Sequence, residues 1–150
     1  MIMDARTLFA EEVAIGGSTG IRLVGDVIDL SNARDIGVSD VWLVIICTTD
    51  LTSGGAATVT FQLASDAQAA IATDGSATVH LATADMAYAG IDAGDRILVA
   101  RLPIEASGAP YERYLGILAN VSTAALTAGK ITAFLTMDPP VRKLYPNNVQ

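Results

Sequence analysis

The chain has little of the chemistry on which most catalytic sites depend. Its 150 residues include one cysteine, Cys47, and one histidine, His80. A single cysteine excludes a disulfide within the chain, and its place in an apolar segment predicts an inert buried thiol. A nucleophilic triad needs the histidine beside a serine or cysteine and an acid, and no Gly-x-Ser-x-Gly motif supports one. We therefore expect His80 to be structural.

Charged and aromatic residues are also scarce. Charged residues make up 17% of the chain, against ~25% in typical soluble domains. The formal net charge of −7 argues against a nucleic-acid partner, because phosphate contacts need clustered lysine and arginine. Aromatic residues, at 5%, form no stripe on which single-stranded bases would stack. Apolar residues reach 51%, which predicts either a large core or partners that cover apolar surface.

Long apolar runs are missing as well. The longest, Val41–Cys47, has only the length of a strand, whereas a membrane-spanning helix needs ~20 apolar residues. Asp4, Glu11 and Glu12 interrupt the first residues and no basic leader precedes them, so we expect no secretory signal. The sequence predicts neither a membrane nor nucleic acid as a direct partner.

What is present is a strand pattern, clearest near the C-terminus. Alternate residues from Leu115 to Val121 are apolar, and the segment from Ile131 to Met137 repeats the alternation. Successive side chains of a strand point to opposite faces, so a period of two indicates a half-buried strand. We predict that these two strands are antiparallel partners at the centre of a β domain.

Similar segments recur along the chain between turn residues, and no long helical pattern appears. We predict further strands at residues 27–30, 41–47, 58–63, 78–82 and 96–103. This spacing predicts an all-β fold. A jelly-roll β-sandwich of about eight antiparallel strands fits it, and an immunoglobulin-like sandwich is the main alternative. The apolar run at 41–47 indicates a strand that is covered on both faces or that meets another subunit with one face.

The chain divides into three expected parts: an N-terminal arm at 1–25, a jelly-roll body at 26–138 and an extended C-terminal tail at 139–150. Within the arm, residues 7–14 have the composition of a short helix. The glycine-rich run at 16–20 lacks the preceding strand and the Gly-Lys-Ser/Thr ending of a phosphate-binding loop, so we interpret it as a flexible hinge.

Other polar residues give only weak indications of a site. Asp85, Asp92 and Asp95 surround a loop and carry oxygen ligands of the kind calcium takes, but their spacing is not that of an EF-hand. Glu105 and Glu112 would form a carboxylate pair for glycoside hydrolysis only at a suitable separation, which the sequence does not give. We expect solvated turn aspartates, no metal and no cofactor.

The two ends of the chain carry the features that indicate assembly. An extended segment with apolar side chains can add itself to the sheet edge of a neighbour, although an unpartnered chain end is commonly disordered, and both interpretations stay open. If the ends dock, the predicted partner-binding residues are Arg142, Lys143, Leu144 and Tyr145 in the tail, and Leu8 and Phe9 in the arm.

Several segments resemble one known family. Glu112–Gly116, Thr123–Gly129, Lys130–Leu135 and the earlier Ala93–Leu98 are similar to segments of the capsid cement (decoration) proteins of tailed phages. The resemblance implies a jelly-roll fold and a structural, non-enzymatic role in the virion. It also implies a place on the outer surface of the icosahedral head, where copies made in the host cytoplasm bind the major capsid protein and self-associate as a dimer or trimer.

Two other classes of function remain as alternatives. A carbohydrate-binding β-sandwich module or a virion surface adhesin would need an exposed aromatic platform, for which the sequence offers few residues. An enzyme is the third possibility, and the single histidine is the main argument against it.

Overall fold

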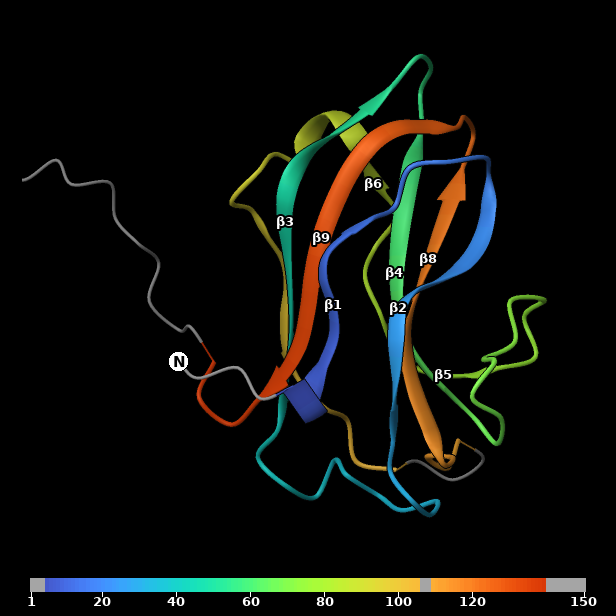
Figure 1. Cartoon of the computed structure of the whole chain (residues 1–150), viewed down its shortest axis with the longest axis vertical. Helices are drawn as coiled ribbons and strands as arrows, with labels where there is room; N and C mark the ends of the chain where they lie inside the picture. The colour runs from blue at the N-terminus through green and yellow to red at the C-terminus, as the bar shows by residue number, and fades with distance from the viewer. Residues whose placement is uncertain (1–4, 106–108, 140–150) are drawn as a thin grey trace, which may run out of the picture.

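The described residues of the computed structural model are 5–105 and 109–139, and they form two packed β-sheets (Figure 1). No α-helix occurs in these ranges; the only helical segments are 3-10 turns, η1 (Ala5–Thr7) and η2 (Tyr88–Gly90). The strands are β1 (Leu8–Ala14), β2 (Gly20–Asp29), β3 (Trp42–Ser53), β4 (Thr58–Asp66), β5 (Thr78–Ala82), β6 (Met86–Ala87), β7 (Arg96–Arg101), β8 (Tyr114–Ser122) and β9 (Leu126–Thr136). The all-β prediction is confirmed.

The order of the strands is that of a jelly roll. One sheet runs β1-β9-β3-β7 and the other β2-β8-β4-β5, with β6 paired to β4. The antiparallel pairs are nested, since β1 pairs with β9, β2 with β8, β3 with β7 and β4 with β5. A ribbon of nested pairs rolled up in this way distributes successive strands over two sheets, as in a jelly roll. The jelly-roll prediction is therefore confirmed over its immunoglobulin-like alternative.

The predicted pairing of the two C-terminal strands is wrong. β8 pairs with β2 and β4, whereas β9 pairs with β1 and β3 in the other sheet. The short link between Ser122 and Leu126 crosses from one sheet to the other. Each strand does lie in the interior of its own sheet, but they face each other across the core and are not hydrogen-bonded neighbours. Alternation showed which side chains are buried and left the hydrogen-bonding partner undetermined.

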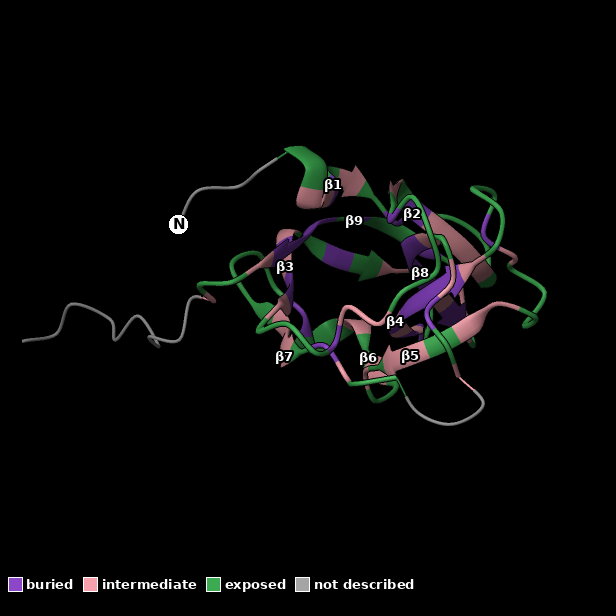
Figure 2. Ribbon diagram, turned by 90° about the horizontal axis from the view of Figure 1, so that it is seen from below, coloured by how far each residue is buried: buried purple, intermediate pink, exposed green. Residues whose placement is uncertain are grey.

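The main core fills the space between the two sheets (Figure 2). Alternate residues of β8 and β9 point into it, so that Leu115, Ile117, Ile131 and Ala133 are fully buried. Phe61 of β4 lies in the same cluster. Burial of this apolar surface is the main favourable contribution to folding, and Phe9, Phe61 and Tyr111 are the buried aromatic residues of this cluster.

The central strands are also covered on their second faces. A small cluster of Ala64, Ile71 and Leu118 lies outside the β2-β8-β4-β5 sheet. The side chain of Ile71 lies so close to Gly116 that a Cβ at that position would overlap it. In the other sheet Val44 is 0% exposed, although it points away from the main core. The apolar run of residues 41–47 is therefore that of a central strand covered on both faces.

The N-terminal segment differs from its prediction. Residues 7–14 do not form a helix, because β1 pairs with β9 and buries Phe9 and Ala10 against the core. Register shifts interrupt this pairing, and the backbone N–H of Glu12 donates to Thr132 Oγ1 over 3.1 Å. Sheet pairing and burial outweigh a weak local helix preference. Much of the expected arm at 1–25 thus contributes strands to the sandwich.

The glycine-rich run at 16–20 forms the turn between β1 and β2. Gly17 makes an isolated bridge with Leu126, and Gly17 and Gly20 have positive φ angles of 140° and 123°. Arg22 donates from Nη1 to the carbonyl oxygens of Ile15 and Gly16, and from Nη2 to that of Ser18. The glycines supply backbone conformations that other residues rarely adopt, and the carbonyl oxygens of the turn accept hydrogen bonds from Arg22, whereas a phosphate-binding loop presents backbone N–H donors.

Candidate functional site

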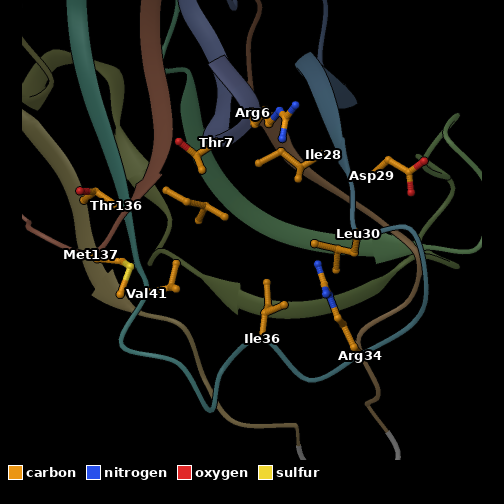
Figure 3. Close-up of a pocket in the computed structure, with 11 residues that line it drawn as sticks. Arg6, Thr7, Ile28, Asp29, Leu30, Arg34, Ile36, Val41, Thr136 and Met137 are labelled. Carbon is orange, nitrogen blue, oxygen red and sulfur yellow. The ribbon is translucent and has the colours of Figure 1, made fainter. Parts of the chain in front are cut away.

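A groove lies at one end of the sandwich. This end, called the base below, is where β2 and β9 end and β3 and β8 begin, at the bottom of Figure 1. The groove has a volume of about 530 Å³, and Figure 3 shows its lining side chains arranged around it. These residues are Arg6, Thr7, Ile28, Asp29, Leu30, Arg34, Ile36, Val41, Leu135, Thr136 and Met137.

The floor of the groove is apolar and continuous with the main core. Leu30 and Leu135 are buried, and Ile28, Ile36 and Val41 are partly buried against the core cluster. At the margin, Met137 leaves 73% of its surface exposed. A partner that covered this surface would remove apolar area from water, which is favourable by roughly 25 cal/mol per Å².

Two arginines and one aspartate supply the charge of the lining. Asp29 is held from outside the groove by Arg113, whose Nε and Nη2 donate to its two carboxylate oxygens over 2.9 and 2.8 Å. These hydrogen bonds, with one from the backbone N–H of Ser31, lower the pKa of Asp29 to about 2. Asp29 therefore remains ionised and paired with Arg113, and the cations that line the groove are Arg6 and Arg34.

The loop between β2 and β3, residues 30–41, forms one wall of the groove and is fixed at several points. Leu30 N donates to the Arg113 carbonyl over 2.8 Å, and Leu102 N donates to the Val41 carbonyl over 2.9 Å. Gly37 lies so close to the Pro103 carbonyl that no Cβ fits there. The loop is thus held against the segments that flank β7 and β8, which fixes the position of Ile36.

Exposed apolar side chains are concentrated around the base. Val38 is 66% exposed, Ile104 63% and Met137 73%, and each lies in a segment adjoining the base. The fourth large exposed apolar residue of the described part, Val79, lies on β5. Scattered single apolar residues are ordinary on a protein surface, but three at one end of the molecule, of which Met137 also lines the groove, indicate a contact surface.

His80, the candidate for chemistry, belongs to a structural network. Its Nε2 lies 2.7 Å from the hydroxyl of Ser65, and its ring stacks on Tyr111 with centroids 3.9 Å apart. Ser65 is 0% exposed and also accepts the backbone N–H of Glu112 over 3.0 Å. Burial lowers the pKa of His80 and raises that of Tyr111 to about 12. A serine hydroxyl enclosed in this way has no access to a substrate.

Asp85, Asp95 and Glu112 also have local structural roles. Asp95 accepts the backbone N–H of Asp92 over 2.9 Å, and Asp85 accepts the hydroxyl of Thr60 over 3.4 Å. Glu112 accepts the hydroxyl of Thr78 over 3.0 Å, which leaves it on the same network as Ser65. Within the described ranges no three histidine, cysteine, aspartate or glutamate side chains are grouped so that they could hold a metal ion.

Cys47 is buried, as predicted, and its thiol donates to the Thr49 carbonyl over 3.1 Å. Burial raises the pKa of this thiol, which disfavours the reactive thiolate. The described part of the chain contains no helix with the length and apolar character needed to traverse a membrane.

The predicted partner-binding residues are divided between described and undescribed parts of the chain. Arg142, Lys143, Leu144 and Tyr145 lie outside the described residues. Leu8 is half-buried at the start of β1, whereas Phe9 is 1% exposed and packs in the core. In the folded chain Phe9 therefore holds β1 in place and offers no surface to a partner. The groove itself was not predicted, because its lining comes from segments with no shared sequence motif.

One of two comparisons with known proteins identifies a family for this chain. A search of curated proteins finds no match to this chain. A scan of protein families matches the family model described as Bbp16 over residues 12–135, which extends from within β1 to the penultimate residue of β9. The family is that of the Bordetella phage cement, or decoration, protein, and membership implies a capsid cement role in the phage virion. The resemblance found in the C-terminal segments is thereby confirmed, and the chain belongs to the Bbp16 family.

Proposed function

We propose that this protein binds the outer surface of the phage head, clamps neighbouring subunits of the major capsid protein and so stabilises the shell. The observation that carries the proposal is the family match, which covers nearly the whole sandwich. A structural role without catalysis agrees with the enclosed Ser65 and with the structural contacts of His80.

The base of the sandwich is the surface that we assign to the capsid. It combines the groove with the exposed side chains of Val38, Ile104 and Met137. Both described ends of the chain, at Ala5 and Pro139, adjoin it, because η1 and the end of β9 contribute to the groove. Residues beyond these ends would start next to the same partner surface.

The tail supplies the second part of the proposed clamp. Arg142, Lys143, Leu144 and Tyr145 combine two cations with an aliphatic and an aromatic side chain. We propose that this segment docks as an extended strand on a neighbouring subunit, where main-chain hydrogen bonds give affinity and alternate side chains give specificity. Leu8, at the start of β1, is the described residue that we retain as a contact beside it.

Mass action explains how weak contacts can stabilise a shell. A ligand that binds only the assembled state stabilises that state by an amount that grows with its concentration relative to its dissociation constant. Many symmetry-related copies repeat the gain over the whole head. Self-association as a dimer or trimer would add to it, and native mass spectrometry of the purified protein tests that part of the proposal directly.

The experiment that tests the role compares decorated with undecorated heads. Quantitative mass spectrometry of gradient-purified virions should find copies of this chain comparable in number to the major capsid protein. Heads assembled without the chain should rupture at lower temperature than heads to which it has been added back. Absence of the chain from virions, or identical rupture temperatures, would contradict the proposal.

The tail is tested by the double substitution Leu144→Ala with Tyr145→Ala. We expect the occupancy of heads to fall severalfold, because both proposed anchors are lost, while thermal unfolding of the purified body is unchanged. Asn147→Ala with Asn148→Ala is the matched control in the same tail. Unchanged occupancy in the Leu144 and Tyr145 variant would exclude tail docking without excluding the cement role.

The carbohydrate-binding alternative receives no support from the surface. Sugar-binding platforms stack a ring on an exposed aromatic side chain, and every aromatic residue within 5–105 and 109–139 is buried or half-buried. Trp42, Tyr88 and Tyr114 are half-buried, and the others lie in the core. A glycan array is the direct measurement, and we expect no binding above background.

A further inference from the structure

We propose that the groove at the base binds an extended, acidic segment of the major capsid protein, which inserts an apolar side chain between Ile36 and Met137 and places a carboxylate beside Arg34. The inference rests on the proposed function and names the chemistry of the partner segment. It is carried by the charge and the apolar floor of the groove.

Charge is the first argument. The chain as a whole has a net charge of −7, yet the groove is lined by Arg6 and Arg34 and by a single acid, Asp29. That acid is paired with Arg113 at 2.8 Å. Arg34 is exposed and has no ion-pair partner among the described residues. Complementarity of charge across an interface determines which partners approach and in which register, so this groove selects an acidic partner.

Figure 3 shows how the cation and the apolar floor are placed relative to each other. The Arg34 side chain extends toward Leu30 on one side of the groove, and Val41 and Met137 lie on the opposite side, with Ile36 between them. A bound segment that crossed the groove would contact the apolar side chains of Met137, Val41 and Ile36, and the Arg34 guanidinium would lie beside them. This spacing suits an apolar residue followed closely by aspartate or glutamate.

The polarity of the lining argues against a small molecule. Small-molecule sites place a few buried polar groups so that they converge on the ligand. Here the buried lining residues are Leu30 and Leu135, while Arg6, Asp29 and Arg34 are all exposed. Exposed charges around an apolar floor have instead the arrangement of a protein interface, with an apolar centre and a polar rim.

The tail of a second copy is disfavoured as the occupant. Residues 140–150 contain Arg142 and Lys143 and no acidic residue. These cations would approach Arg6 and Arg34, and like charges brought together at an interface weaken binding. The groove and the tail are therefore assigned to different contacts on the shell.

Binding to heads that lack the cement protein tests the inference. Such heads, assembled from the major capsid protein, are titrated with the unaltered protein and with Arg34→Glu, and bound copies per capsid subunit are measured. We expect Arg34→Glu to weaken binding by about tenfold and to reduce its salt dependence, because a rim charge acts on association and is screened by salt. Lys130→Glu makes the same change in net charge at an exposed position of β9 outside the groove and should bind within about twofold of the unaltered protein.

A second pair of variants tests the apolar anchor. Met137→Ala should weaken binding severalfold, and Val79→Ala, at an exposed apolar residue outside the groove, should not. Neither arginine nor methionine is buried, so thermal unfolding should be the same in all four variants and in the unaltered protein.

The outcomes separate this inference from the function on which it rests. If the unaltered protein binds heads and Arg34→Glu binds as tightly as Lys130→Glu, the groove is not the docking site and the cement role stands. If the unaltered protein does not bind heads, the groove assignment and the cement role fail together. A small molecule that copurifies with the unaltered protein and is lost from Arg34→Glu, detected by native mass spectrometry, would also overturn the inference.

Discussion

The two ends of this sandwich use their polar groups in opposite ways. At the end opposite the base, called the upper end below, residues beside two short turns bond to each other. Thr52 and Thr127 share a hydrogen bond of 2.8 Å between their hydroxyls, and Ser53 donates to the Ala125 carbonyl over 2.7 Å. At the base the polar groups fix the walls of a groove, and Met137 and Arg34 remain exposed. Polar side chains at the upper end bond mostly to each other, with the buried hydroxyl of Thr58 left without a partner in the described residues, and the base presents a surface that a partner can cover.

The difference follows from the lengths of the connections. The β3–β4 and β8–β9 connections at the upper end span only residues 54–57 and 123–125, whereas the β2–β3 connection at the base spans residues 30–41. A short turn can satisfy its backbone groups locally, but a longer connection needs support from other segments and has room to carry function. We propose on this basis that the upper end contributes stability and that the base contributes recognition.

The strongest test of this comparison is to replace one glycine at each end by alanine, which adds a single methyl group. Gly37→Ala at the base should lower the free energy of unfolding by about 2–3 kcal/mol, because the new Cβ would overlap the Pro103 backbone and overpacking costs typically 1–3 kcal/mol. Chemical denaturation measures the effect. Because residues 36 and 41 would move with the loop, head binding should weaken as well.

Gly54→Ala is the matched substitution at the upper end. No heavy atom lies within 4 Å of the position its Cβ would take, and its φ is not positive. We expect unchanged stability and unchanged head binding. Equal losses for Gly37→Ala and Gly54→Ala would show that the two ends do not differ as described.

A smaller effect is expected from acid acting on the network near the base. Burial lowers the pKa of His80 below its ordinary value of 6.5, while Glu112 and Asp35 oppose the shift. The unfolded chain therefore binds the proton at higher pH than the folded chain does, and stability is lost as pH falls below about 6.5. Protonated His80 would donate to Ser65, which already accepts the Glu112 N–H, and the serine proton would lose its acceptor.

The measurement is the free energy of unfolding between pH 7.5 and 5. We expect it to fall in the unaltered protein and to fall less steeply in His80→Gln, which does not titrate. Asp29 does not contribute in this window, since its pKa of about 2 places its loss of stabilisation below pH 4. Parallel curves for the two proteins would mean that His80 titrates alike in the folded and unfolded states.

The smallest effect is expected from one hydroxyl at the upper end. Ser53→Ala removes the donor to Ala125 and the acceptor of the Gly55 N–H. Solvent can replace both bonds, so we expect a loss of about 0.5 kcal/mol, at the low end for a hydrogen bond. Denaturation measures it, with exposed Thr73→Ala as control, and head binding should not change. A clear loss of binding in Ser53→Ala would assign recognition to the upper end as well.

Much of the fold was predictable from local patterns. The strand predicted at 78–82 has the bounds of β5, and the alternation from Leu115 to Val121 correctly marks the core face of β8. The predictions failed where contacts with other segments of the chain determine the local structure. Residues 7–14 have a weak helix preference, but β9 offers them a sheet edge and a place for Phe9 in the core. The pairing of β8 with β9 was wrong because alternation carries no information about hydrogen-bond partners.

The candidate site was predictable only in part. The sequence directed attention to the chain ends; the groove adjoins the described ends at Ala5 and Pro139, and the partner-binding residues predicted there stay a prediction. It gave no indication that Ile28, Arg34 and Leu135 come together, because these residues lie in separate segments that meet only in the rolled ribbon. The family match, from residue 12 to residue 135, includes these three positions and none of the predicted partner-binding residues.

The sequence by itself determined that this chain is a β-sandwich with a continuous apolar core, because the side-chain period of a strand is a local property that any window of residues displays. It also held the segments that link the chain to the phage cement proteins. Only the tertiary structure decided which strands pair, which turns close on themselves and where Arg34 meets an apolar floor. The physical reason is that backbone hydrogen bonds are alike for every strand, so partner and register are chosen by the burial of the whole sheet and not by any one segment.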